Sequence, residues 1–166
     1  VIMNQLNNLG LKYLELKCPP PIVMLISALM AMIISQRNFE FIQQQLTNVD
    51  TFIWPLVFLI AGIALAIAGI KEFAHFKTTI HPTHPEHTSS LVTTGIYQLT
   101  RNPMYLGLLV VLLGWADLLD SFLAFTGPLF FFLYISAFQI KPEEAVMKSK
   151  FSSEFSEYCS HVRRWL

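Results

Sequence analysis

The sequence predicts an all-α, polytopic membrane protein of about four transmembrane helices. Two observations carry this prediction. Hydrophobic residues make up 54% of the 166 residues and charged residues only 13%, about half the charged share usual in soluble domains. The apolar residues are also gathered into runs that approach the about 20 residues needed to cross a bilayer. We expect a single integral membrane domain over residues 1–166.

The first two expected spans lie in the N-terminal half of the chain. Span 18–36 carries no charged residue. Span 51–70 is the clearest apolar run, and its Gly62, Ala66 and Gly69 offer a face on which another helix can pack closely. The polar residues before the first span do not resemble a cleavable signal peptide, so we expect none.

The other two expected spans form a helical hairpin. Span 102–116 is short and is followed by the link Asp117–Asp120, after which span 121–140 begins. A link of this length requires the two helices to be antiparallel neighbours. We expect Gly127 and Pro128 to kink the fourth span.

The charges predict the orientation of these spans. Four spans place both termini on one side together with the loop 71–101 and the tail 142–166. That side holds all but one of the eleven basic residues: Lys12, Lys17, Lys71, Lys77, Arg101, Lys141, Lys148, Lys150, Arg163 and Arg164. The opposite side holds Arg37 and several acids. By the positive-inside rule, both termini are therefore expected in the cytoplasm.

The tail is expected to form an amphipathic helix on the cytoplasmic face. Its apolar and aromatic residues recur at helical spacing: Phe151, Phe155, Tyr158 and Val162. The formal net charge is zero, so we expect no nucleic-acid partner.

The polar residues at the start of the third span form the first candidate site, within the stretch LVTTGIYQLTRNPMYLG. Asn102 suits a helix N-cap and Pro103 the first helical position. A helix N-terminus with Arg101 beside it attracts an anion such as a carboxylate. Tyr97 and Tyr105 lie nearby in the sequence. The alternative is a capped helix with an interfacial arginine and an aromatic belt.

Paired carboxylates follow the fourth span. Because the hairpin brings the cytoplasmic ends of its helices together, Glu143 and Glu144 are expected to approach Arg101, Asn102 and Tyr105. Facing positive and negative groups would bind a zwitterionic ligand. Alternatively, the two acids only stabilise the positive end of the helix dipole.

Histidines in the loop after the second span suggest a metal site, but two prolines argue against it. His81, His84 and His87 have a three-residue spacing, and His75 precedes them. Proline breaks the helix that would place these rings on one face. A solvated loop is the preferred interpretation, and we expect no metal.

The stretch LVTTGIYQLTRNPMYLG, followed by the pair EE and the tail KFSSEFSEYCSHV, resembles the isoprenylcysteine carboxyl methyltransferase family, which is grouped with the phospholipid methyltransferases. The resemblance covers residues 89–162, and this stretch looks like that of bacterial members. It implies an S-adenosylmethionine-dependent methyltransferase with a hydrophobic or lipid-like methyl acceptor and contacts with membrane lipids. Together with the charge distribution, it leads us to expect the active site on the cytoplasmic side of the bacterial inner membrane.

The resemblance also implies roles for individual residues. It gives the cofactor a set of contacts that spans the loop, the third span and the first acid of the pair: Ser89, Ser90, Leu91, Val92, Tyr97, Asn102, Pro103, Met104, Tyr105 and Glu143. For the methyl transfer itself we expect Arg101 and Glu144 to be the catalytic residues, with Arg101 steering the acceptor and Glu144 organising the basic groups.

Two positions depart from the family pattern. Asn102 stands where the family has a histidine, and an amide does not titrate, which argues against a general base there. Gln139 stands where eukaryotic members resemble one another in having a substrate-contacting arginine, which argues against the prenylcysteine carboxylate as the substrate. A carboxylate acceptor, as in isoprenylcysteine carboxyl methylation, stays one of the possibilities. Two other functions stay open. One is a membrane reductase of the sterol-reductase type, which would bind NADPH, and the other is a non-enzymatic membrane scaffold, which would bind neither nucleotide.

Overall fold

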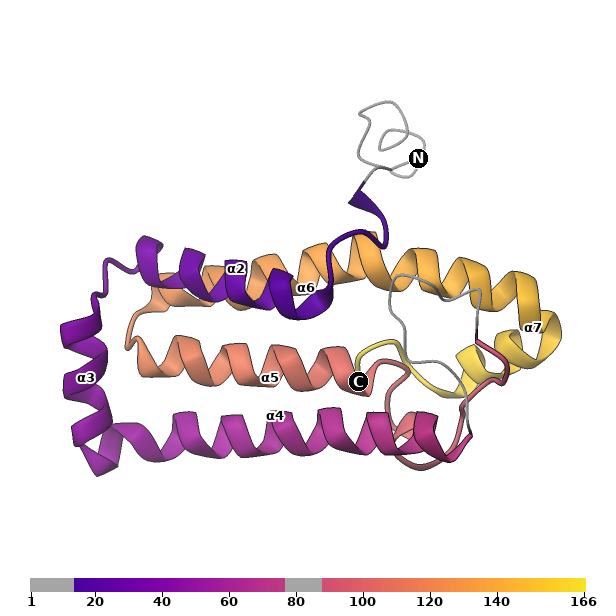
Figure 1. Cartoon of the computed structure of the whole chain (residues 1–166), viewed down its shortest axis with the longest axis horizontal. Coiled ribbons are helices and arrows are strands. Elements are labelled where there is room, and N and C mark those ends of the chain that lie inside the picture. The colour runs from indigo at the N-terminus through magenta and orange to yellow at the C-terminus, as the bar shows by residue number, and fades with distance from the viewer. Residues whose placement is uncertain (1–13, 77–87) are drawn as a thin grey trace.

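The computed structural model describes residues 14–76 and 88–166 (Figure 1). Every regular element in these two ranges is helical. Seven are α- or π-helices and two, η3 and η4, are short 3-10 helices. In chain order they are α2 (Pro20–Ile34), α3 (Phe39–Thr47), α4 (Val49–His75), η3 (Gly95–Gln98), α5 (Pro103–Leu118), η4 (Phe122–Phe125), α6 (Thr126–Tyr134), the π-helix η5 (Ile135–Ile140) and α7 (Lys141–His161).

The long helices lie side by side as an elongated bundle. α5 runs between α4 on one side and α2 with α6 on the other, and α3 crosses one end of the bundle (Figure 1). At the other end α4 finishes, α5 begins and α7 folds back; we call this the polar end. Arg37 lies at the α3 end and donates hydrogen bonds to the carbonyls of Leu119 (3.0 Å) and Asp120 (2.9 Å).

Two helical runs are long and apolar enough to cross a membrane. They are α4, with 27 residues, and the continuous run Phe122–His161, with 40. At 1.5 Å per residue, α4 is about 40 Å long, which exceeds the hydrocarbon thickness of a bilayer. α2 and α3 make a third span only if they count together, and they are bent by 97°. α5 is apolar but has 16 residues, so the count of four spans stays a prediction.

The contact between α4 and α5 is close, and glycines make it possible. A Cβ atom on Gly62 would lie 2.5 Å from the carbonyl oxygen of Gly107, and one on Gly107 would lie 3.2 Å from the Cβ of Ala66. Farther along α4, Gly69 faces Pro103. Small residues let the two backbones approach, as they do in many membrane helix pairs. The expected close-packing face of the second span is present.

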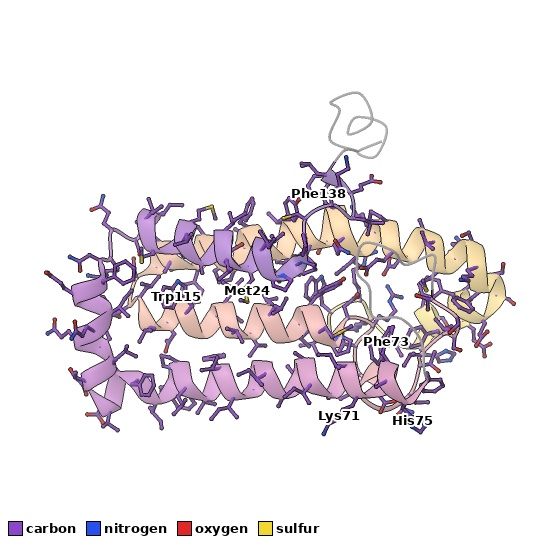
Figure 2. All side chains as sticks on the ribbon, in the orientation of Figure 1. Met24, Lys71, Phe73, His75, Trp115 and Phe138 are labelled. Carbon is purple, nitrogen blue, oxygen red and sulfur yellow. The ribbon has the colours of Figure 1, made fainter. Side chains whose placement is uncertain are left out.

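The layer between α5 and α2 is filled by large side chains. Met24 and Trp115 lie there (Figure 2), and the indole N–H of Trp115 donates to the carbonyl of Ala28 over 3.0 Å. Phe131 of α6 and Ile135 of η5 are fully buried against the same core. By contrast, many leucines and isoleucines of α2 and α4 are exposed on the outer surface, where lipid would cover them.

Two features differ from the sequence-based expectation. Residues 39–47, for which no helix was predicted, form α3, whose start is capped by Asn38 through a bond from Phe41 N–H (2.9 Å). The helix of the fourth expected span does not end at residue 140. It runs from α6 through the π-helix η5 into α7, and η5 is where it departs from α geometry. Pro128, which was expected to kink this helix, lies in the first turn of α6, where its missing N–H removes no helical bond.

The tail does not form one straight helix. Ser152, within α7, has non-helical backbone angles (φ 39°, ψ −103°). The chain reverses direction in this region and returns toward the start of α5 (Figure 1). As a result, the last residues of the chain reach the polar end of the bundle.

Candidate active site

The start of α5 has the expected geometry but not the expected cap. Asn102 occupies the N-cap position and Pro103 the first helical position. The Asn102 side chain makes no capping bond; its Nδ2 donates instead to the carbonyl of Arg164 over 2.9 Å. The first N–H groups of α5 therefore receive no side-chain cap from Asn102, and they keep the partial positive charge of a helix N-terminus.

Glu143 joins the two helices of the hairpin. Its Oε1 accepts a hydrogen bond from the Tyr105 hydroxyl (2.6 Å) and another from Gln139 Nε2 (2.7 Å). Tyr105 and Gln139 are both buried, with exposed fractions of 9% and 2%. Two donors on one oxygen fix the carboxyl group of Glu143 toward α5. The expected approach of Glu143 to Tyr105 is therefore present.

Glu144, the next residue, faces two arginines. Its Oε1 lies 2.9 Å from Arg101 Nη2, and both of its oxygens are bound by Arg164, through Nε (3.0 Å) and Nη2 (2.6 Å). Such a two-bond pairing of a guanidinium with a carboxylate is strong and directional. The hydrogen bonds with Glu144 raise the pKa of the Arg164 guanidinium. The predicted approach of Glu144 to Arg101 is also present.

Arg101 retains one unused donor. Its Nη1 lies 3.4 Å from the carbonyl of Cys159, and its backbone N–H donates to the carbonyl of Arg163 (3.0 Å). Its Nε is buried and has no hydrogen-bond partner among the described residues. A buried donor without a partner is unfavourable by about 1–3 kcal/mol. An anionic ligand would supply the missing acceptor.

Tyr97 lies between α4 and the tail. Its carbonyl accepts a 2.7 Å bond from the Tyr158 hydroxyl, and its ring packs on that of Phe73, with centroids 5.5 Å apart. Burial is the main cause that raises the pKa of Tyr97, so its hydroxyl stays neutral at physiological pH. The preceding segment is anchored to α4 because Thr94 donates to Glu72 over 2.7 Å.

The structure brings most of the predicted site residues to the polar end. The contacts above join Arg101, Asn102, Tyr105, Glu143 and Glu144 through the start of α5 and the start of α7. Pro103 and Met104 form the first turn of α5 and face Gly69 of α4, whose missing Cβ also leaves room for the Tyr97 hydroxyl.

The four loop residues predicted to contact the cofactor, 89–92, lie in the irregular segment that leads to η3, at the same end of the bundle (Figure 1). Val92 is buried, Ser90 and Leu91 are half-buried, and Ser89 is exposed.

Two residues of the cluster were not predicted as site residues. Arg164 was counted only as a cytoplasmic charge, and Gln139 only as a departure from the family pattern. Gln139 could have been predicted, because it lies one helical turn before Glu143 and residues at that spacing are neighbours on a helix. Arg164 could not be predicted from its local sequence, because its contacts with Glu144 depend on the reversal of the chain after Ser152.

The histidines do not contribute to this cluster as far as the structure describes them. His75 is exposed, and it points away from the bundle together with Lys71 (Figure 2). His81, His84 and His87 lie outside the described residues. Within residues 14–76 and 88–166, no group of three or more potential metal ligands is gathered.

Comparison with known proteins points to one family. The sequence profile of the phospholipid methyltransferases matches residues 51–154, from the start of α4 into α7. An uncharacterized protein of Haemophilus influenzae is 48% identical over 63 residues, which cover 38% of this chain and 100% of that protein. No solved structure matches. The matched range includes Arg101, Tyr105, Glu143 and Glu144, whereas Arg164 lies beyond it.

Proposed function

Because the chain belongs to the phospholipid methyltransferase family and is a membrane methyltransferase, we propose that it uses S-adenosylmethionine to methylate a hydrophobic or lipid-like acceptor. The observation that carries the proposal is the polar cluster at one end of an otherwise apolar bundle. There, Glu143 and the Arg101 guanidinium flank the uncapped start of α5.

The residues of this cluster fit the polar part of such a cofactor. The methionyl end of S-adenosylmethionine carries a carboxylate and an ammonium group. The start of α5, where no side chain caps the first N–H groups, suits the carboxylate. Glu143, already held by Tyr105 and Gln139, suits the ammonium group or the ribose hydroxyls.

The segment before α5 would complete the cofactor site. We assign to this site the stretch Ser89, Ser90, Leu91 and Val92, together with Tyr97, Asn102, Pro103 and Met104. The Tyr97 hydroxyl stays protonated and so acts as a neutral contact. These assignments rest on the family resemblance together with the position of the residues at the polar end.

The chemistry requires little from the protein beyond positioning. S-adenosylmethionine supplies an electrophilic methyl group when bound. Arg101 would orient an anionic acceptor, and Glu144 would hold Arg101 in place. A carboxylate acceptor, as in isoprenylcysteine carboxyl methylation, fits because it is already anionic at neutral pH and needs no general base. Orientation of two reactants lowers the barrier by up to about 7–11 kcal/mol.

Calorimetry with S-adenosylhomocysteine, the demethylated product, tests the proposal in detergent-purified protein. We expect saturable binding by the wild type. Glu143→Gln should weaken binding at least about tenfold, because the negative charge opposite the ammonium group is lost. Glu154→Gln is the matched control, since Glu154 is an exposed acid of the same helix, and its affinity should equal that of the wild type.

Each outcome has a definite meaning. No heat of binding at millimolar S-adenosylhomocysteine would refute the proposed cofactor. Equal affinity for the two glutamine variants would refute the placement of the site at Glu143. Thermal protection by NADPH without protection by S-adenosylhomocysteine would favour a reductase. The acceptor is then sought by incubating the enzyme with labelled cofactor and membrane lipid extracts, followed by mass spectrometry.

A further inference from the structure

The segment 162–166 is fixed to three helices at the polar end. The Arg163 carbonyl accepts from Arg101 N–H (3.0 Å), and the Arg164 carbonyl accepts from the side chains of Thr100 (3.2 Å) and Asn102 (2.9 Å). The Trp165 indole donates to Ser136 Oγ (3.1 Å). These bonds tie the segment to the start of α5 and to η5, in addition to the Arg164 contacts with α7.

The Trp165 ring adds an apolar contact. It packs on Phe132 of α6, with ring centroids 5.0 Å apart. The Val162 side chain is buried. Segment 162–166 therefore has both a polar and an apolar anchor, and it brings the Arg164 guanidinium to a defined place beside α7.

Glu143 and Glu144 are neighbours with different partners. The Glu143 carboxyl turns to Tyr105, whereas both oxygens of Glu144 are held by Arg164. Adjacent residues on a helix are about 100° apart around its axis, which follows from 3.6 residues per turn. A rotation of the first turn of α7 that moved Glu144 away from Arg164 would therefore also move Glu143 away from Tyr105.

We propose that Arg164 is a positioning residue of the active site, which fixes the rotation of α7 through Glu144 so that Glu143 faces Tyr105 and Gln139. The proposal rests on the proposed function in assigning Glu143 to the cofactor. Arg164 would not touch the cofactor itself. It would set the orientation of the carboxyl group that does, from outside the range matched by the family profile.

Arg163 provides a matched control for a test of this proposal. Arg164→Ala removes the two-bond contact with Glu144, and Arg163→Ala removes the same charge from the adjacent, exposed position. Arg164→Lys keeps the charge but cannot reproduce both bonds in the same plane. The variants are compared by S-adenosylhomocysteine calorimetry and by infrared spectroscopy of the Glu143 carboxyl band, which is identified by its loss in Glu143→Gln.

We expect Arg164→Ala to shift the Glu143 band and to weaken S-adenosylhomocysteine binding about tenfold, a coupling of the size usual between contacting residues. Arg164→Lys should be intermediate, and Arg163→Ala should match the wild type in both measurements. In the Glu143→Gln background, Arg164→Ala should cause little further loss, because its effect passes through Glu143.

The result that would overturn the proposal is an unchanged Glu143 band in both Arg164 variants, or the same tenfold loss with and without Glu143. That second pattern would mean that Arg164 stabilises the fold without positioning the carboxyl group. If the wild type binds no S-adenosylhomocysteine but the band still shifts in Arg164→Ala, the proposed function fails while the positioning role stands.

Discussion

At the residue scale, the Tyr97 hydroxyl predicts a pH dependence of stability. Burial raises its pKa above the ordinary value of 10.0, so the folded protein keeps a proton that the unfolded chain loses above pH 10. Stability is therefore complete below pH 10 and falls as the pH rises beyond it, by about 1.4 kcal/mol per pH unit for one such group. Tyr97→Phe should remove this contribution.

Thermal unfolding in detergent between pH 8 and pH 11.5 measures the effect. The wild-type unfolding midpoint should fall more steeply above pH 10 than that of Tyr97→Phe, and the two curves should run parallel below pH 9. Lysines also titrate in this range, but they are common to both proteins and cancel in the difference. Parallel curves over the whole range would show that the Tyr97 hydroxyl ionises normally.

The sequence predicted the pairing of site residues where the hairpin alone determines it. The short link between α5 and the fourth helix was enough to place Glu143 near Tyr105 and Glu144 near Arg101. It did not predict the use of the Asn102 amide, which bonds to Arg164 and leaves the helix start uncapped. This hydrogen bond depends on Arg164, which lies far away in the sequence, and capping preferences consider only the residues next to the helix start.

At the scale of elements, the crossing of α4 and α5 should not tolerate a larger residue at Gly62. Valine there would overlap the backbone of α5, since even a Cβ would lie 2.5 Å from the Gly107 oxygen. We expect Gly62→Val to destabilise the protein by about 1–3 kcal/mol, the usual effect of overpacking. Ala64→Val is the control, because Ala64 lies on the exposed side of the same helix.

The unfolding midpoints of these two variants decide the matter. Gly62→Val should unfold several degrees below the wild type, and Ala64→Val should remain close to it. Similar midpoints for both variants would mean that the two helices separate without loss, so that their close contact does not hold the start of α5 in place.

Elements were predicted well where an apolar run was long and less well where it was short or polar. The run 51–70 lies within α4, which continues to His75 because the residues after Ile70 also favour a helix. The segment that forms α3, FEFIQQQLT, has too few apolar residues to be predicted as a membrane span. Its Phe39 and Leu46 are exposed, as expected of a helix that lies in the membrane interface.

At the scale of the whole molecule, the uneven distribution of charge predicts which end faces the cytoplasm. Among the described residues, the polar end carries most of the basic side chains, and α3 lies at the other end with Glu40 and Asp50. We expect the polar end in the cytoplasm. Single cysteines at Ser153 and at Gln44, in a protein whose Cys18 and Cys159 are replaced by alanine, test this orientation.

A membrane-impermeant maleimide should label the cysteine at position 44 in cells whose outer membrane has been removed and whose inner membrane is intact. It should label the cysteine at position 153 only after the cells are permeabilised. The reverse pattern would place the active site outside, away from the cytoplasmic supply of S-adenosylmethionine. The span count could not be predicted in the same way, because α5, with 16 residues, is shorter than the hydrocarbon layer is thick.

The π-helix η5 has a consequence for how chain length can vary among relatives. A π turn holds one residue more than an α turn, so Ile135–Ile140 absorbs an extra residue while α6 and α7 keep their facing surfaces. Loss of one residue within this stretch would convert it to a regular α-helix and leave Glu143 directed at Tyr105. Loss of one residue from α6 would instead turn the two acids away. Relatives that differ here by a single-residue gap can therefore share the same active site.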